Sequence, residues 1–95
     1  MTPEGRVKER VKKILKGFNA YVVMPATGGY GNSGTPDFLI CHKGRFIGVE
    51  CKAGKGEPTA LQLAHLAAIA SNGGISVIIR EHNVESLEQI LKDIP

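Results

Sequence analysis

The fold is decided by residues 34–52, which read GTPDFLICHKGRFIGVECK. Two apolar runs, 38–41 and 46–51, flank the polar pair Lys43-Gly44. Apolar runs on either side of a short glycine-containing turn predict a β-hairpin. Both runs are rich in Phe, Ile, Val and Leu, so we expect both faces of the hairpin to be covered by other parts of the chain.

The position of the turn fixes which residues face each other. With a turn at 43–44, or a four-residue loop at 42–45, Asp37 lies opposite Glu50, and strand alternation places Lys52 on the same face. Two opposed carboxylates repel each other, and a divalent cation relieves that repulsion best. Magnesium takes oxygen ligands from one or two carboxylates. The hairpin therefore predicts a cation site between Asp37 and Glu50, with Lys52 beside it.

This combination of groups suits phosphodiester hydrolysis. A bound cation polarises a phosphoryl oxygen and lowers the pKa of its water, so that a nucleophile forms near neutral pH. Lys52 can orient that water or stabilise the charge that grows on the phosphorus. An Asp followed by Glu-x-Lys also occurs by chance in short chains; the hairpin register gives the pattern its weight here.

Length and charge bound the remaining possibilities. A chain of 95 residues has room for a single domain, 1–95, with one small core, and dimerisation would add stability. A net charge of +3 permits nucleic-acid binding, and a basic protein without such a partner stays an open alternative. No apolar run reaches the ~18 residues of a membrane span, and no signal peptide is evident, so we expect a cytoplasmic protein.

The two cysteines, Cys41 and Cys51, fall on the two hairpin strands and point to opposite faces in this register. We therefore expect no disulfide and interpret both as buried structural thiols in a reducing cytosol. We place His42 in the turn, His65 on a helix surface and His82 in a loop. Together with the cysteines, these histidines match no zinc-site spacing.

The first helix is expected to start at Thr2 as N-cap, with Pro3 in the first helical position, and to end near Gly17. Apolar residues recur at helical spacing and define its buried face: Val7, Val11, Ile14 and Leu15. Glu4 lies near this stripe and should point inward, whereas Glu9 should point to solvent. Alternatively, Glu4 is only a first-turn acid favoured by the helix dipole.

The opposite face of this helix is basic. Its residues are Arg6, Lys8, Arg10, Lys12, Lys13 and Lys16. This face is either simply solvated or contacts phosphates, and the sequence does not decide between the two.

The rest of the chain supplies strands at 20–24 and 75–80, a helix at 59–72, and a last helix capped by Asn83. The order is α-β-β-β-α-β-α, an α/β fold with a mixed sheet flanked by helices. Residues 26–34 hold four glycines but lack the spacing of a nucleotide-binding loop. Tyr30 is the aromatic residue there that can stack on a base or pack across an interface.

Gln62 has two interpretations. The spacing Thr59-x-x-Gln62 forms a capping box, in which Gln62 bonds to the N-cap amide. Gln62 also shares a line with Leu66 and Ile69, so it can face the sheet. The spacing alone favours the cap.

These motifs, in this order, resemble the VRR-NUC branch of the PD-(D/E)xK nuclease superfamily, and in particular its short, stand-alone, phage-type members. The resemblance runs from residue 2 to about residue 80. It is carried by TPEG at 2–5, MP at 24–25, GTPD at 34–37, GRF at 44–46, ECKAG at 50–54 and PTALQ at 58–62. It implies a restriction-endonuclease-like core.

The resemblance also implies roles. Asp37 and Glu50 would be metal ligands together with the carbonyl of Cys51 and with Glu4 as the first-helix acid, and the metal would be Mg²⁺ or Mn²⁺. Lys52 would be the catalytic lysine. Gln62 would support the site, which reverses the preference for the cap.

Similar single-domain members form homodimers and cut branched DNA such as Holliday junctions. The implied function is therefore a metal-dependent DNA endonuclease, acting in the host cytoplasm if phage-encoded. Two alternatives remain: a non-catalytic nucleic-acid-binding module on a nuclease fold, and a small interaction protein with a chance motif. The intact Asp, Glu-x-Lys and Gln set argues against the first of these.

Overall fold

The structure is a computed structural model that describes residues 1–26 and 34–95. Tyr30 and most of the glycine-rich stretch lie outside the described residues. The elements are α1 (Pro3–Phe18), β1 (Tyr21–Val23), β2 (Phe38–His42), β3 (Arg45–Cys51), α2 (Ala60–Ser71), β4 (Ile75–Ile79) and α3 (Val84–Asp93). The predicted order α-β-β-β-α-β-α is confirmed. None of the helices in the described part combines the length and apolarity that a membrane span requires.

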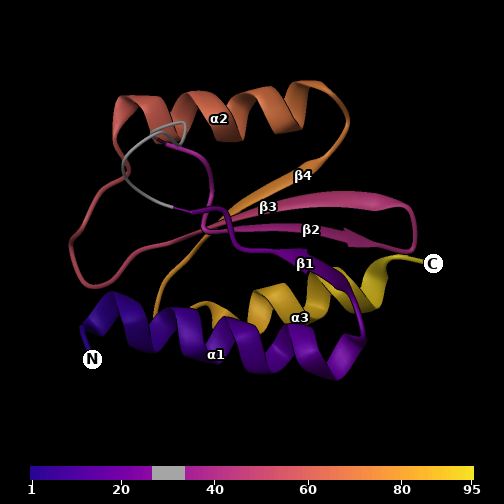
Figure 1. Cartoon of the computed structure of the whole chain (residues 1–95), viewed down its shortest axis with the longest axis horizontal. Coiled ribbons are helices and arrows are strands. Elements are labelled where there is room, and N and C mark those ends of the chain that lie inside the picture. Colours follow the sequence, from indigo (N-terminus) through magenta and orange to yellow (C-terminus); the bar gives the residue numbers. More distant parts are fainter. Residues whose placement is uncertain (27–33) are drawn as a thin grey trace.

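The strands form one mixed sheet in the order β1-β2-β3-β4. The first two pairings are antiparallel, and β4 lies parallel to β3. Figure 1 shows three layers, with α1 and α3 on one face of the sheet and α2 on the other. The start of α1, the end of β3 and the start of α2 lie on the same side of the molecule.

The central hairpin has the predicted register, with Leu39 opposite Gly48. Its turn is the two-residue one, because His42 pairs with Arg45. Lys43 and Gly44 have φ angles of 50° and 83°. Hairpin turns of this type need positive φ at both central positions, which glycine supplies freely and other residues at some cost.

The core lies between the sheet and the pair α1 and α3. Alternate residues of β2 and β3, such as Phe38, Ile40, Ile47 and Val49, are fully buried there. The other face is covered only in part, since α2 packs on β3 and β4. Contact there is close at Gly48, where an added Cβ would lie 2.5 Å from Ile69 Cδ1.

This partial cover corrects the expectation that both cysteines are buried. Cys51 is buried in the core, whereas Cys41 is exposed, because its face of β2 is not under α2. Both thiols are free. His42 was placed in the turn; instead it ends β2, and its buried ring packs edge-to-face against Phe18, 5.9 Å between ring centroids.

Two helix ends differ in detail from expectation, although both lie within a residue of the expected positions. α1 passes Gly17 and ends where Asn19 adopts a left-handed conformation, with φ 55°. Asn83 precedes α3 but makes no capping hydrogen bond. Its side chain turns back to the end of β4, accepting a hydrogen bond from Arg80 N and donating one to Ile78 O. The Thr2 cap of α1 is confirmed by the hydrogen bond that its Oγ1 accepts from Gly5 N.

Candidate active site

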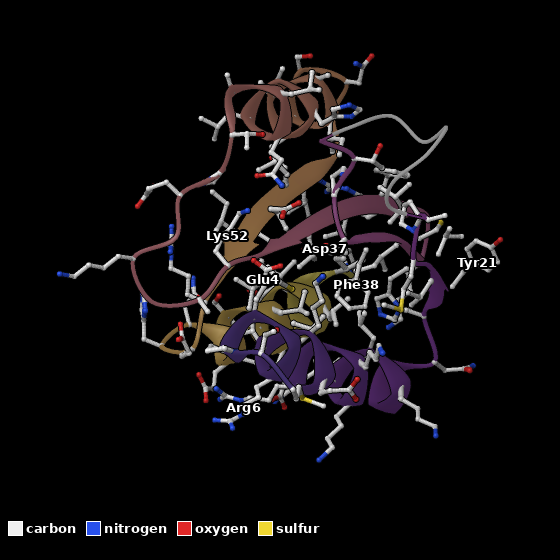
Figure 2. The ribbon with its side chains drawn as sticks, turned by 60° about the vertical axis from the view of Figure 1, so that its left-hand side comes forward. Glu4, Arg6, Tyr21, Asp37, Phe38 and Lys52 are labelled. Carbon is white, nitrogen blue, oxygen red and sulfur yellow. The ribbon has the colours of Figure 1, made fainter. Side chains whose placement is uncertain are left out.

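The predicted site residues gather where α1, the hairpin and α2 meet. In Figure 2, Glu4, Asp37 and Lys52 lie near one another at this junction, whereas Arg6 and Tyr21 point away from it. Glu50 and Gly48 share a face of β3, and that face looks toward α2. The site therefore involves residues of both helical layers, with Gln62 from α2 on Glu50 and Lys8 from α1 on Asp37.

Asp37 precedes β2 and is held from two sides. Its Oδ2 accepts a hydrogen bond of 2.8 Å from the backbone N–H of Cys51, which ties it to the end of β3. Its Oδ1 lies 3.3 Å from Lys8 Nζ on α1. The side chain of Asp37 is only 11% exposed.

Glu50 is the most buried acid of the site, with a side chain 3% exposed. Its Oε2 accepts a hydrogen bond from Gln62 Nε2 at 3.3 Å and lies 3.8 Å from Lys52 Nζ. Its Oε1 is buried and has no hydrogen-bond partner among the described residues. A buried carboxylate oxygen without a partner is costly unless a proton or a cation satisfies it.

Burial is also the main reason why the pKa of Glu50 is raised, to about 7. The negative charge of Asp37 raises it further, and the ammonium of Lys52 acts in the opposite direction. The charge of Asp37 thus opposes the ionisation of Glu50, which is the electrostatic setting that a divalent cation relieves. The thiol of Cys51 has its pKa raised to about 12, mainly by burial, so it stays neutral and only the Cys51 carbonyl is suited to a hard cation.

Gln62 has both of its predicted roles, since it completes the capping box of α2 and also contacts Glu50. Its Oε1 accepts a hydrogen bond from Thr59 N, and Thr59 Oγ1 accepts one from Gln62 N, which completes the capping box. The amide nitrogen that remains is the one that donates to Glu50. The alternatives were therefore not exclusive, because a side-chain amide has separate donor and acceptor ends.

Glu4 is half-buried, and it is linked to Asp37 by the ammonium of Lys8, which contacts both carboxylates. Its Oε2 lies 3.5 Å from Lys8 Nζ, and the same ammonium contacts Asp37. The sequence placed Lys8 on the basic outer face of α1, and this was wrong. Lys8 is one turn beyond Glu4, so both side chains lie on the same side of the helix, and the acidic partner across the gap draws the lysine inward.

Two further residues were missed. Arg80 Nη1 donates to the carbonyls of Gly54 and Gly56, and both carboxylate oxygens of Glu81 accept from Gly54 N. These residues directly follow β4, and their hydrogen bonds hold the loop that follows Lys52. Only the pairing of β4 with β3 brings them there, so the one signal was the presence of charges directly after an apolar strand.

The donor set fits magnesium or manganese in its chemistry. Asp37 and Glu50 offer carboxylate oxygens, one of them without a partner among the described residues, and Lys52 and Gln62 contact Glu50. Within the described residues, no three His, Cys, Asp or Glu side chains are arranged as a metal cluster. The Lys8 ammonium lies between Glu4 and Asp37, and Cys51 ends β3 with its N–H on Asp37.

Comparison with known proteins supports the fold. No sequence-family model matches the chain. No curated protein matches it in sequence. A solved structure described as "VRR_NUC domain" is similar to it with a TM-score of 0.77 and 22% sequence identity, over 100% of both chains. The restriction-endonuclease-like architecture and the likeness to a VRR-NUC domain are therefore confirmed at the level of the fold.

Proposed function

We propose that this protein is a metal-dependent DNA endonuclease that hydrolyses phosphodiester bonds. The observation that carries the proposal is the pairing of Asp37 with Glu50, next to Lys52 and Gln62. Within residues 1–26 and 34–95, Glu50 Oε1 has no hydrogen-bond partner. The fold, shared with a VRR_NUC domain, supports the same reading.

In this proposal Asp37, Glu50 and the Cys51 carbonyl hold Mg²⁺ or Mn²⁺, and Glu4 joins them from α1. The metal supplies Lewis acidity toward a phosphoryl oxygen and a water of lowered pKa. Lys52 orients the attacking water and stabilises negative charge that develops during attack. Gln62 holds the Glu50 carboxylate, and the capping box in turn fixes the Gln62 side chain.

The substrate is proposed to be branched DNA, resembling a Holliday junction, bound by a homodimer. The first helix presents exposed basic residues, Arg6, Lys13 and Lys16, for phosphate contacts. On the other side of the molecule α2 has no charged residue, and Leu61 and Leu63 are each 49% exposed. An exposed, uncharged helix of this kind suits contact with a second copy.

A cleavage panel tests the function. Four-way junction, flap, splayed arm and linear duplex are incubated with Mg²⁺, Mn²⁺ or EDTA. We expect cutting of the branched substrates only with metal. We expect Lys52→Ala and Asp37→Asn to lower the rate at least about 100-fold. Lys52→Ala removes the positive charge that stabilises the transition state, and Asp37→Asn removes a charged ligand of the metal.

The controls change the same charges elsewhere. Lys55→Ala alters the exposed loop three residues downstream, and Asp93→Asn alters the exposed end of α3. Both should cut at the wild-type rate. If Asp37→Asn and Lys52→Ala cut as fast as wild type, the site assignment is wrong. Salt-sensitive DNA binding without metal uptake or cleavage favours the non-catalytic binding module instead.

A further inference from the structure

We infer that Lys8 is a built-in counter-ion that occupies the cation position of the metal-free site and is displaced when the metal binds. The inference rests on the proposed metal site and assigns it a residue that sets metal affinity. Lys8 would then have two effects. It would stabilise the metal-free protein, and it would lower the affinity of the site for the metal.

The geometry carries this inference. The Lys8 ammonium lies 3.3 Å from Asp37 Oδ1 and 3.5 Å from Glu4 Oε2, so it bridges acids from two different elements. The other oxygen of Asp37 is engaged by Cys51 N at 2.8 Å. Both oxygens of Asp37 are therefore engaged before any metal arrives.

A divalent cation at Asp37 Oδ1 would lie within a few ångströms of the ammonium. At such a distance two positive charges repel strongly in a half-buried setting. The ammonium must withdraw, and Lys8 has room to do so because its side chain is 31% exposed at the edge of the site. Lys52 does not have to withdraw in the same way, because its ammonium contacts Glu50 Oε2. The cation would bind the other oxygen, Oε1, which has no hydrogen-bond partner among the described residues.

The same helix offers a matched control. Lys12 also pairs with an acid, Glu9, at 3.0 Å, but this pair is exposed and remote from Asp37. Lys8→Met and Lys12→Met remove the same charge from the same helix. They differ only in whether that charge sits at the site.

Isothermal titration of Mn²⁺ into the DNA-free protein tests the inference. We expect Lys8→Met to bind Mn²⁺ roughly tenfold more tightly than wild type, and Lys12→Met and the charge-keeping Lys8→Arg to bind within about twofold of it. In EDTA, Lys8→Met should melt several degrees below Lys12→Met, because Asp37 and Glu4 lose their counter-ion. If Lys8→Met does not fold in EDTA, Lys8→Gln takes its place.

The outcomes separate the two proposals. Equal or weaker Mn²⁺ binding by Lys8→Met, with normal wild-type binding, overturns the role of Lys8 and leaves the nuclease proposal standing. Absence of Mn²⁺ binding by wild type, Lys8→Met and Lys12→Met alike overturns the metal site itself, and the role of Lys8 with it.

Discussion

At the scale of single residues, Glu50 makes the site sensitive to pH. Burial and the charge of Asp37 raise its pKa from 4.5 to about 7. Between these two pH values Glu50 is protonated in the folded protein and ionised in the unfolded chain. The contribution of Glu50 to the free energy of unfolding therefore falls as the pH rises from about 4.5 through 7, and the loss is complete above 7.

We predict that Glu50→Gln is more stable than wild type in EDTA at pH 8, by about 2 kcal/mol. The difference should shrink toward pH 5, where wild-type Glu50 is largely protonated. Urea unfolding at a series of pH values measures it, with Glu9→Gln, whose side chain is 46% exposed, as control. Added Mg²⁺ should reverse the order, because only wild type keeps both carboxylates. A stability difference that does not vary with pH would contradict the assigned ionisation.

Gln62 allows its two roles to be separated. Thr59→Ala removes the hydroxyl that caps α2 but leaves the amide that donates to Glu50. We predict a loss of about 1 kcal/mol in stability, with the cleavage rate retained within a few fold. Gln62→Ala should lose similar stability and also most of the cleavage activity. Equal activity of the two variants in a junction-cleavage assay would show that the contact with Glu50 does not matter.

At the scale of elements, the segment before Asp37 is positioned by its approach to α2. Gly34 has a φ of 90°, and an added Cβ would lie 2.8 Å from Leu61 C and 2.9 Å from Gln62 N. Both neighbours are backbone atoms of the first turn of α2, which cannot move alone. Glycine at this position therefore lets the Asp37 segment and the Gln62 helix meet.

We predict that Gly34→Ala destabilises the protein by about 1–3 kcal/mol and lowers cleavage as well. Gly17→Ala is the matched control, since Gly17 lies within α1 with nothing within 4 Å of an added Cβ. It should be neutral or stabilise by up to about 1 kcal/mol. Thermal unfolding compares the two variants. A Gly34→Ala protein as stable and active as wild type would show that the close approach is not needed.

At the scale of the whole molecule, the chain has a polar and an apolar side. Six of the twelve Lys and Arg residues lie on α1, and helix α2, which has no Lys, Arg, Asp or Glu, lies on the opposite face of the sheet (Figure 1). Two copies with a net charge of +3 repel least when they approach through α2. We predict that Leu63→Glu, which puts a charge on α2, converts the proposed dimer to a monomer.

Sedimentation velocity measures this change. Val23→Glu is the comparison, because Val23 is 40% exposed on the edge strand β1, away from α2. If Val23→Glu is monomeric and Leu63→Glu is dimeric, the dimer interface lies at the β1 edge and not at α2. A monomeric wild-type protein would remove the homodimer from the proposal.

Much of this arrangement could be predicted from the sequence, because it follows from local rules. The Lys43-Gly44 turn fixes the hairpin register, and the register brings Asp37 and Glu50 to the same end. Lys8, Arg80 and Asn83 could not be predicted in this way. Each is drawn to a partner on another element, and sequence periodicity describes only a residue's own helix or strand. The burial of Cys41 likewise depends on which strands α2 packs against.

The central claim is that Asp37 and Glu50 form a metal site. The most direct measurement is anomalous diffraction at the manganese edge from crystals soaked in MnCl₂. We predict a peak bounded by Asp37, Glu50 and the Cys51 carbonyl, with Glu50 Oε1 as a ligand and the Lys8 ammonium moved off Asp37. A fully soaked crystal with no peak there, or with manganese bound only elsewhere, would contradict the claim.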